Sequence, residues 1–287
     1  MSRIRELILP ADEATVFDPT AGSLFFVGTA TVLLRYAGLT ILTDPNFVHA
    51  GDHVHLGYGL TAQRLTNPAV DIEELPHVDL CLLSHHHGDH FDPVAEEQLR
   101  KDLPIVTTHH ASRKLEKKGF TETVPLSTWE SVVVHKGPAR VRITAMPGRH
   151  GPPIVHHLLP PVMGSLLELS PAAGRAALRI YISGDTLLFD DLHEIPRRYP
   201  EIDLALFHLG GTRVLGVLLT MDAAQGVEAI RVLAPAEVIP IHFDDYDVFK
   251  SPLSDFQKAV EQAGLTSRVR YLHRGDNYRF EVPPGRL

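Results

Sequence analysis

The sequence predicts an α/β protein, in which strands and helices alternate along the chain. Three observations carry this prediction. Short runs rich in β-branched and other apolar residues recur through most of the sequence. Segments that begin with capping residues and end near glycine separate several of these runs. Several strand-like runs also end directly in histidine or aspartate, so polar side chains gather at strand ends.

Length and composition fit one compact domain. The 287 residues are 44% hydrophobic, which is ample for a large core, and we predict a single domain over residues 1–287. The only cysteine, Cys81, lies in an apolar run and is interpreted as a buried small hydrophobe. The sequence has no signal-peptide core and no apolar window of ~18 residues, so we expect a cytoplasmic protein without a membrane span.

The charge pattern favours a small-molecule substrate. The formal net charge is −8, and no run of lysine and arginine is longer than a scattered pair. A nucleic-acid partner is disfavoured, because phosphate contacts need a clustered basic face. An anionic small molecule stays open as the substrate. The sequence makes no prediction of oligomeric state.

The first half of the chain begins with three predicted strands, at residues 24–27, 31–36 and 39–43. Ala37-Gly38 joins the last two as a hairpin. Segment 45–75 is polar and rich in glycine and proline, and we expect a long loop near the active site. Its histidines could line the cleft or be solvated.

A buried strand is predicted next, from the apolar run at 78–83. Asp92 followed by Pro93 predicts the cap and first turn of a helix that ends near Lys101. In the second half, strands are predicted near Val132 and at 141–146, 165–169, 178–183, 202–207 and 237–241. Helices are predicted over about 187–199, from a Thr220 cap to about Leu233, and from Ser251-Pro252 to Gly264.

The most specific motif is H-x-H-x-D-H, which is formed by His85, His87, Asp89 and His90 directly after the strand-like run. In an extended chain, residues i, i+2 and i+4 point to one side, so the first three can converge. Gly88 lets the chain bend so that His90 approaches from the other side. Imidazole and carboxylate groups suit zinc, manganese or iron. The pattern predicts a metal site, and a solvated histidine-rich loop is the alternative.

Three later strand ends supply matching groups. His150 follows the strand ending at Met146, Asp185 follows the strand 178–183, and His242 follows the strand 237–241. Each residue alone is a weak signal. The ordered set is a strong one, and together with the H-x-H-x-D-H cluster it resembles the metallo-β-lactamase superfamily from about residue 22 to the final strands. The resemblance implies a four-layer αββα sandwich.

The opening segment is similar to one branch of that superfamily. Val27-Gly-Thr-Ala-Thr and Ile41-Leu-Thr-Asp-Pro are similar to the branch that contains L-ascorbate-6-phosphate lactonase and N-acyl phosphatidylethanolamine phospholipase D. Thr29 stands where that branch usually has histidine. Asp44 would orient the metal-binding histidines without binding an ion itself. As an alternative, Asp44 before Pro45 is simply a turn former.

The resemblance also implies a centre of two divalent metal ions, with zinc as the first candidate and manganese or iron as the others. Seven side chains would bind the ions: His85, His87 and His150 the first, Asp89, His90 and His242 the second, and Asp185 both. A shared hydroxide would be the nucleophile, because metal binding lowers the pKa of water to around 7. Asp89 would orient it and receive its proton.

The predicted function is metal-dependent hydrolysis of a small ester, lactone or phosphodiester. His208, at the end of an apolar strand, is expected to contact substrate or protonate a leaving group, or else to be a packed histidine. No cysteine ligand is present, so antibiotic hydrolysis is not expected. The alternatives are a di-iron or mononuclear iron redox protein on the same fold and a non-catalytic metal-binding protein.

Overall fold

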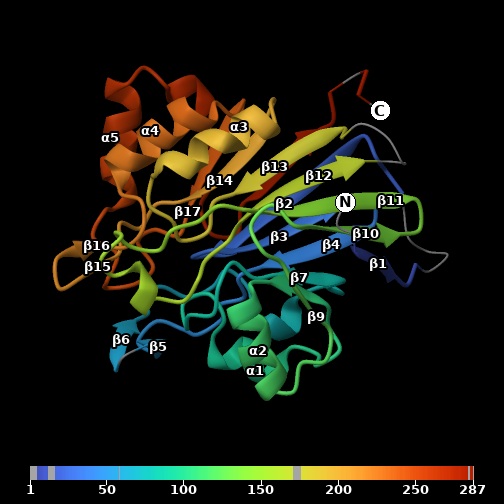
Figure 1. Cartoon of the computed structure of the whole chain (residues 1–287), viewed down its shortest axis with the longest axis horizontal. Helices are drawn as coiled ribbons and strands as arrows, with labels where there is room; N and C mark the ends of the chain where they lie inside the picture. The colour runs from blue at the N-terminus through green and yellow to red at the C-terminus, as the bar shows by residue number, and fades with distance from the viewer. Residues whose placement is uncertain (1–4, 12–16, 58, 171–175, 284, 287) are drawn as a thin grey trace.

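The computed structural model describes residues 5–11, 17–57, 59–170, 176–283 and 285–286, and these residues form four layers (Figure 1). Two seven-stranded mixed sheets lie face to face in the middle. The first sheet contains, in spatial order, β18 (Asn277–Glu281), β2 (Ala21–Gly28), β3 (Thr31–Tyr36), β4 (Leu39–Thr43), β7 (Leu80–Leu82), β8 (Ile105–Thr107) and β9 (Thr123–Pro125). The second contains β1 (Arg5–Leu9), β10 (Ser131–Lys136), β11 (Ala139–Met146), β12 (Gly164–Ser170), β13 (Leu178–Ile182), β14 (Leu204–His208) and β17 (Glu237–Ile241).

Helices cover the outer face of each sheet (Figure 1). The first sheet carries α1 (Pro93–Gln98) and α2 (His109–Lys117), and the second carries α3 (Glu194–Arg198), α4 (Ala223–Leu233) and α5 (Leu253–Gln262). Short 3₁₀ turns are η1 (Ile72–Glu74), η2 (His156–Leu158), η3 (Asp190–His193) and η4 (Thr266–Arg268). No helix in the described part of the chain is long and apolar enough to cross a membrane.

Three apolar clusters fill the three spaces between the layers. Along β3, Val32 and Leu34 face the other sheet, whereas Leu33 packs in the cluster under α1 and α2. This alternation is the period of two that a strand covered on both faces requires. The cluster under α4 and α5 includes Ile230 of α4 and Phe256 of α5. The predicted αββα sandwich is confirmed.

Strand direction brings the polar strand ends to one edge of each sheet. In the first sheet β4 and β7 are parallel. In the second, β13, β14 and β17 are parallel, and β11 runs the same way because both β11 and β13 are antiparallel to β12. The carboxyl ends of these strands therefore share an edge, which is where ligands bind in α/β sheets.

Most predicted elements are present, with two corrections to helices. The stretch 187–199 contains η3 and the short helix α3 instead of one long helix. Pro196 explains this, because proline is accepted in the first turn of a helix but not further in. The cap of α4 is Asp222, whose side chain accepts from the Gln225 amide at 3.2 Å, whereas Thr220 Oγ1 accepts from the Thr212 amide.

Segment 45–75 is not loop throughout. It contains the hairpin of β5 (His53–Gly57) and β6 (Leu60–Gln63), together with η1. Along His53-Val54-His55-Leu56 the residues are alternately exposed and buried, which is the pattern of a strand. The sequence alone favours a loop here, because the exposed positions are polar histidines. A second small hairpin, β15 (Arg213–Val214) and β16 (Val217–Leu218), lies at the same side of the molecule (Figure 1).

Candidate metal centre

The structure brings His85, His87 and His150 together as one group of buried imidazoles. His85 Nε2 lies 3.0 Å from His87 Nδ1, and the His150 ring centroid lies 5.2 Å from each of the other two. The strand β7 ends just before the first two, and the end of β11 delivers the third from the other sheet. His150 Nδ1 donates to the Leu219 carbonyl at 3.1 Å, which leaves Nε2 directed away from that contact and available to a metal.

Asp89, His90, Asp185 and His242 form a second buried group. His90 Nε2 lies 3.3 Å from Asp185 Oδ2 and 3.8 Å from Asp89 Oδ2. His242 Nε2 lies 3.5 Å from an oxygen of each of these two carboxylates. All seven predicted ligands therefore lie in two adjoining groups. Asp185 belongs to the second group, and its bridging role stays a prediction.

The chemistry of this donor set fits a metal centre. Several buried atoms of the set, among them His87 Nε2, Asp89 Oδ1 and His242 Nδ1, have no hydrogen-bond partner among the described residues. Leaving a buried polar atom unpaired costs about 1–3 kcal/mol, so several together indicate a missing ligand. Burial holds the pKa of His85 well below its ordinary value and lowers that of His87 to about 3. Both rings are therefore neutral, as metal ligation requires.

The carboxylates of the second group favour positive charge between them. Burial alone would raise the pKa of Asp89, but His90 and His242 outweigh it and lower the pKa to about 2. Burial would likewise raise the pKa of Asp185, yet His242 and His90 hold it well below its ordinary value. Two ionised carboxylates in a buried pocket are strongly stabilised by a dication.

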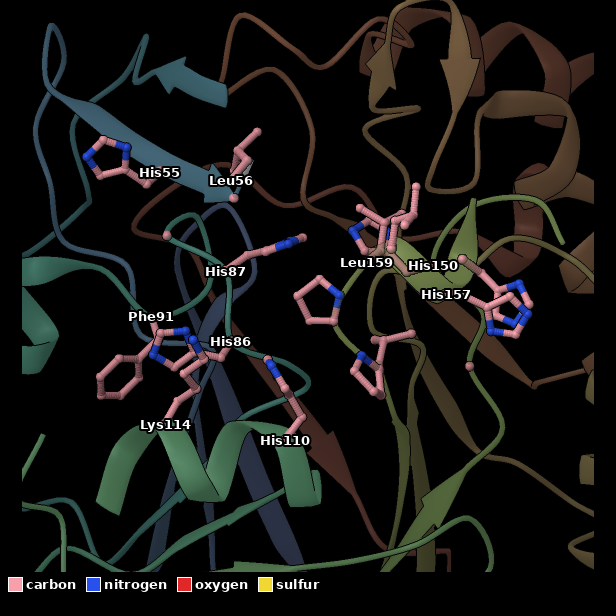
Figure 2. Close-up of a pocket in the computed structure, with 18 of the residues that line it drawn as sticks. His55, Leu56, His86, His87, Phe91, His110, Lys114, His150, His157 and Leu159 are labelled. Carbon is pink, nitrogen blue, oxygen red and sulfur yellow. The ribbon is translucent and has the colours of Figure 1, made fainter. Parts of the chain in front are cut away.

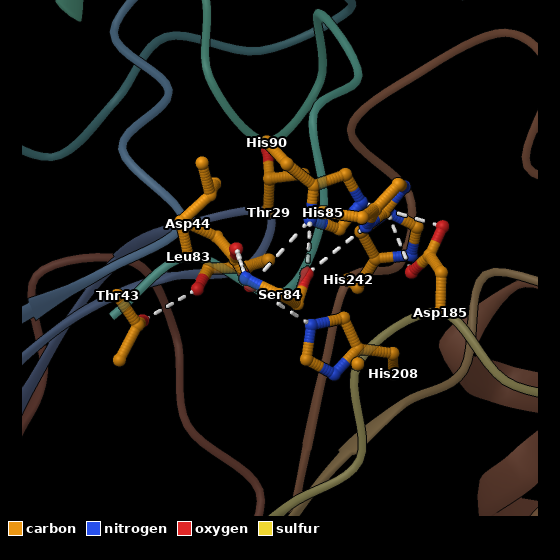
Figure 3. Close-up of polar contacts among 12 residues, drawn as sticks. Thr29, Thr43, Asp44, Leu83, Ser84, His85, His90, Asp185, His208 and His242 are labelled. Carbon is orange, nitrogen blue, oxygen red and sulfur yellow. Dashed lines mark hydrogen bonds and ion pairs between the residues drawn. The ribbon is translucent and has the colours of Figure 1, made fainter. Parts of the chain in front are cut away.

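Asp44 lies behind the second group, where it was predicted to orient the metal-binding histidines. Its Oδ1 accepts from the Ser84 amide at 2.7 Å, and its Oδ2 lies 3.5 Å from His90 Nδ1 (Figure 3). Contacts with His208 and His90 keep the pKa of Asp44 below its usual range although burial opposes this. The carboxylate is thus ionised, and it faces the side of the His90 ring that points away from Asp185.

His208 lies beside Asp44, behind the proposed metal ligands. It is fully buried, and its Nε2 lies 3.5 Å from Asp44 Oδ2 (Figure 3). Its Nδ1 lies 3.2 Å from Ser183 Oγ. Its ring stacks on His90 with the planes 10° apart and the centroids 5.8 Å apart. His208 is absent from the linings of both cavities at the site. Its predicted contact with substrate stays a prediction.

A buried polar network, which the sequence did not predict, supports the loop of residues 84–90 that carries the H-x-H-x-D-H motif, here called the metal loop. Arg64 is 1% exposed, and its Nη1 donates to Thr29 Oγ1 and Asn46 Oδ1. Asn46 Nδ2 donates to the Gly88 carbonyl at 3.1 Å. The Thr29 carbonyl accepts from the His242 amide at 2.6 Å. The network therefore holds the backbone at His242 and at Gly88, the residue before Asp89. A single arginine in a polar segment has no sequence pattern that signals such burial.

Gly88 is needed for contact with the β5–β6 hairpin. Its amide donates to the His55 carbonyl at 3.1 Å, and a Cβ at this position would lie 2.8 Å from that oxygen. Gly88 does not have a positive φ, so the glycine is required by this close approach of two backbones and not by the predicted bend. The hairpin positions the loop that carries His87 and Asp89.

Two cavities reach the site. The larger, which we call the polar cleft, has a volume of about 880 Å³ and is lined by His87 and His150 together with Lys114, Lys118, Arg149 and several imidazoles. Figure 2 shows His55 and Leu56 on one side of it and His150, His157 and Leu159 on the other. The smaller, which we call the leucine pocket, has a volume of about 250 Å³.

Comparison with known proteins places this geometry in a family. A family model described as a beta-lactamase superfamily domain matches residues 40–243, which include all seven candidate ligands. The chain belongs to this family. A UPF0173 metal-dependent hydrolase of Archaeoglobus fulgidus is 28% identical over 222 residues, which are 75% of this chain and 87% of that protein.

Solved structures show the same fold with different chemistry. The isothiocyanate hydrolase from Delia radicum gut bacteria matches with a TM-score of 0.75 over 90% of this chain and 99% of that one, at 20% identity. CmlA, a diiron β-hydroxylase from Streptomyces venezuelae, matches with a TM-score of 0.65 over 92% of this chain and 55% of that one, at 18% identity. The predicted metallo-β-lactamase fold is confirmed. The narrower resemblance to the lactonase and phospholipase D branch stays a prediction.

Proposed function

We propose that this protein is a metal-dependent hydrolase that cleaves a small ester, lactone or phosphodiester at a dinuclear centre. The observation that carries the proposal is the pair of buried His/Asp groups, whose ligand atoms lie within 4.8 Å of one another in each group. Relatives over most of the chain are named metal-dependent hydrolases, which supports the same class here.

The proposed ligands are the seven predicted residues. His85, His87 and His150 would hold one ion, and Asp89, His90 and His242 would hold the other, with Asp185 between them. Zinc is the first candidate, because it accepts neutral imidazole and carboxylate in tetrahedral or five-coordinate sites. When bound, two such ions lower the pKa of water and stabilise the oxyanion that develops.

The protein's own side chains would handle the proton and the substrate. Water oxygen would form the new bond to the carbonyl carbon or phosphorus, the bond to the leaving oxygen would break, and the proton that Asp89 takes from water would pass to that oxygen. Asp89 has an unpartnered Oδ1 in the site and would receive the proton from water. The cationic groups of the polar cleft, such as Lys114 and Arg149, would attract an anionic portion of the substrate.

Other parts of the proposal follow from sequence. The similarity of the opening segment to the lactonase and phospholipase D branch favours these bond types over β-lactams. The acidic net charge favours a small molecule over nucleic acid. The single buried cysteine agrees with the expected cytoplasmic location.

A substrate panel tests the proposal. Metal-loaded protein is assayed on nitrophenyl phosphodiesters, simple lactones, aryl esters and a chromogenic cephalosporin, with Asp89→Ala as the control. We expect turnover in at least one of the first three classes and its loss in the control. Turnover of the cephalosporin alone, rates equal to the control on every substrate, or an optical spectrum of iron without any hydrolysis would contradict it.

A further inference from the structure

The leucine pocket opens directly onto the candidate metal centre. Four of its lining residues, His87, Asp89, His150 and Asp185, are buried and therefore form its inner end. Nearly all of the remaining wall is aliphatic, and six residues that form much of it are Leu56, Leu60, Leu158, Leu215, Val217 and Leu219. A reacting group held by the centre would thus meet an apolar wall in this pocket. The polar cleft adjoins the pocket, because Leu56, His87 and His150 line both.

The outer wall exposes leucines to solvent. The described surface has six exposed large hydrophobic residues, and three of them, Leu60, Leu158 and Leu215, line this one pocket. They come from β6, η2 and the β15–β16 hairpin, which are far apart in sequence. Isolated exposed leucines are ordinary, but their gathering around one opening marks a ligand-binding site.

Leu215 is the most exposed of these three leucines. It and Gly216 form the two-residue turn between β15 and β16, with φ values of 49° and 82°. Both central positions of such a turn favour asparagine, aspartate or glycine. Leu215 is nevertheless a leucine, and it is 97% exposed, so no packing within the described residues compensates for its strained backbone. A contact with an apolar ligand at the rim of the pocket supplies a reason for this residue.

We propose that the leucine pocket binds an apolar hydrocarbon group of the substrate, attached close to the bond that is cleaved. The polar remainder of the substrate would then lie in the polar cleft, among groups such as Lys114. This inference rests on the proposed hydrolytic function, and it narrows the substrate class to compounds with one apolar and one polar side.

The test is a chain-length series on the metal-loaded full chain. The substrates are p-nitrophenyl esters and alkyl p-nitrophenyl phosphodiesters whose chains run from two to eight carbons. Each buried methylene is worth roughly fourfold, so four of them raise kcat/KM on the order of 100-fold in whichever series is hydrolysed. Val217→Trp, which adds a bulky side chain to the pocket wall, should remove this gain, so that kcat/KM no longer rises with chain length.

Matched surface variants separate the pocket from general hydrophobicity. Leu215→Ser should flatten the chain-length dependence. Leu65→Ser, which changes an exposed leucine outside the pocket, should leave it intact. A flat series in the parent, or equal effects of the two serine variants, would overturn the inference. So would a dimer by light scattering that Leu215→Ser converts to monomer, because the leucines would then serve an interface.

A binding measurement distinguishes this inference from the proposed function. Octanoate should bind the parent more tightly than acetate in calorimetry, and Val217→Trp should remove the difference. If no substrate is hydrolysed but this difference is present, the hydrolase proposal fails and the pocket assignment stands. If hydrolysis occurs but neither rates nor binding depend on chain length, the pocket assignment fails alone.

Discussion

Asp44 contacts both the backbone of the metal loop and two histidine side chains. Its carboxylate accepts from the Ser84 amide and lies 3.5 Å from both His90 and His208. We expect Asp44→Ala to weaken metal affinity by roughly 10–100-fold, as losses behind metal ligands do. Competition with a chelating dye measures this. The control is Asp71→Ala, which removes an exposed carboxylate beside the exposed His49, and an equal loss in this control would contradict the assignment.

His208 should behave differently from Asp44, because it contacts Asp44 but belongs to neither of the two proposed ligand groups. We expect His208→Ala to retain both metal ions and to lower kcat/KM by roughly tenfold, since Asp44 loses a partner that positions it. Metal analysis and steady-state kinetics on the same preparation give both readouts. Kinetics identical to the parent on every hydrolysed substrate would remove His208 from the site.

Gly88 is the residue where the metal loop depends on backbone contact. A Cβ there would lie 2.8 Å from the His55 carbonyl oxygen, so Gly88→Ala must displace the loop that carries His87 and Asp89. A shift of ~1 Å costs on the order of 100-fold in turnover. Gly119→Ala is the comparison, because it has a strained φ of 89° but no neighbour within 4 Å. Melting curves and kinetics should show destabilisation in both variants and loss of turnover only in the first.

At the scale of elements, α1 and α4 are each capped by an aspartate, and the two aspartates differ in the number of backbone amides that they bind. Asp92 accepts from the Ala95 amide at 2.7 Å to cap α1, and it also accepts from the Phe47 and Val48 amides. Asp222 accepts only from the Gln225 amide among the hydrogen bonds found for its side chain. Asp92 therefore also ties the segment after β4 to α1.

These contacts predict unequal costs of removal. Asp222→Ala should lower the free energy of unfolding by about 1 kcal/mol, as an ordinary cap does. Asp92→Ala should lower it by at least about 3 kcal/mol, because three buried amides lose their acceptor. Urea denaturation followed by circular dichroism measures both values. Similar costs for the two variants would show that the extra bonds of Asp92 contribute little.

At the scale of the whole molecule, the candidate metal centre joins the two halves of the sandwich. His85, His87, Asp89 and His90 follow a strand of the first sheet, whereas His150, Asp185 and His242 follow strands of the second. An ion bound by residues from both sheets stabilises the folded state only, because the unfolded chain does not assemble the site. Metal content and global stability should therefore be linked.

We expect about two metal ions per chain in purified protein and loss of activity on chelation. Each ion adds about 2.7 kcal/mol when its free concentration is ~100 times Kd, so chelation should lower the melting temperature by roughly 10 °C. Elemental analysis and calorimetry provide the measurements. Asp185→Ala should lose the second ion and nearly all turnover. One ion in fully loaded protein, or a melting temperature unaffected by chelation, would contradict this picture.

The sequence by itself determined the α/β class, most of the strands, and the residues of the candidate centre. Apolar periodicity is a local property, and H-x-H-x-D-H places several metal-binding side chains within six residues. His150, Asp185 and His242 were identifiable because each follows a strand, although their convergence required the family resemblance.

Only the tertiary structure decided which groups support that centre and what surrounds it. The burial of Arg64, the contact of Gly88 with β5, and the position of His208 behind His90 all depend on segments that are distant in the chain. The β5–β6 hairpin was hidden because its exposed histidines resemble a polar loop. The leucine pocket forms where two hairpins and η2 lie side by side, and a local sequence pattern cannot predict contact between segments so far apart in the chain.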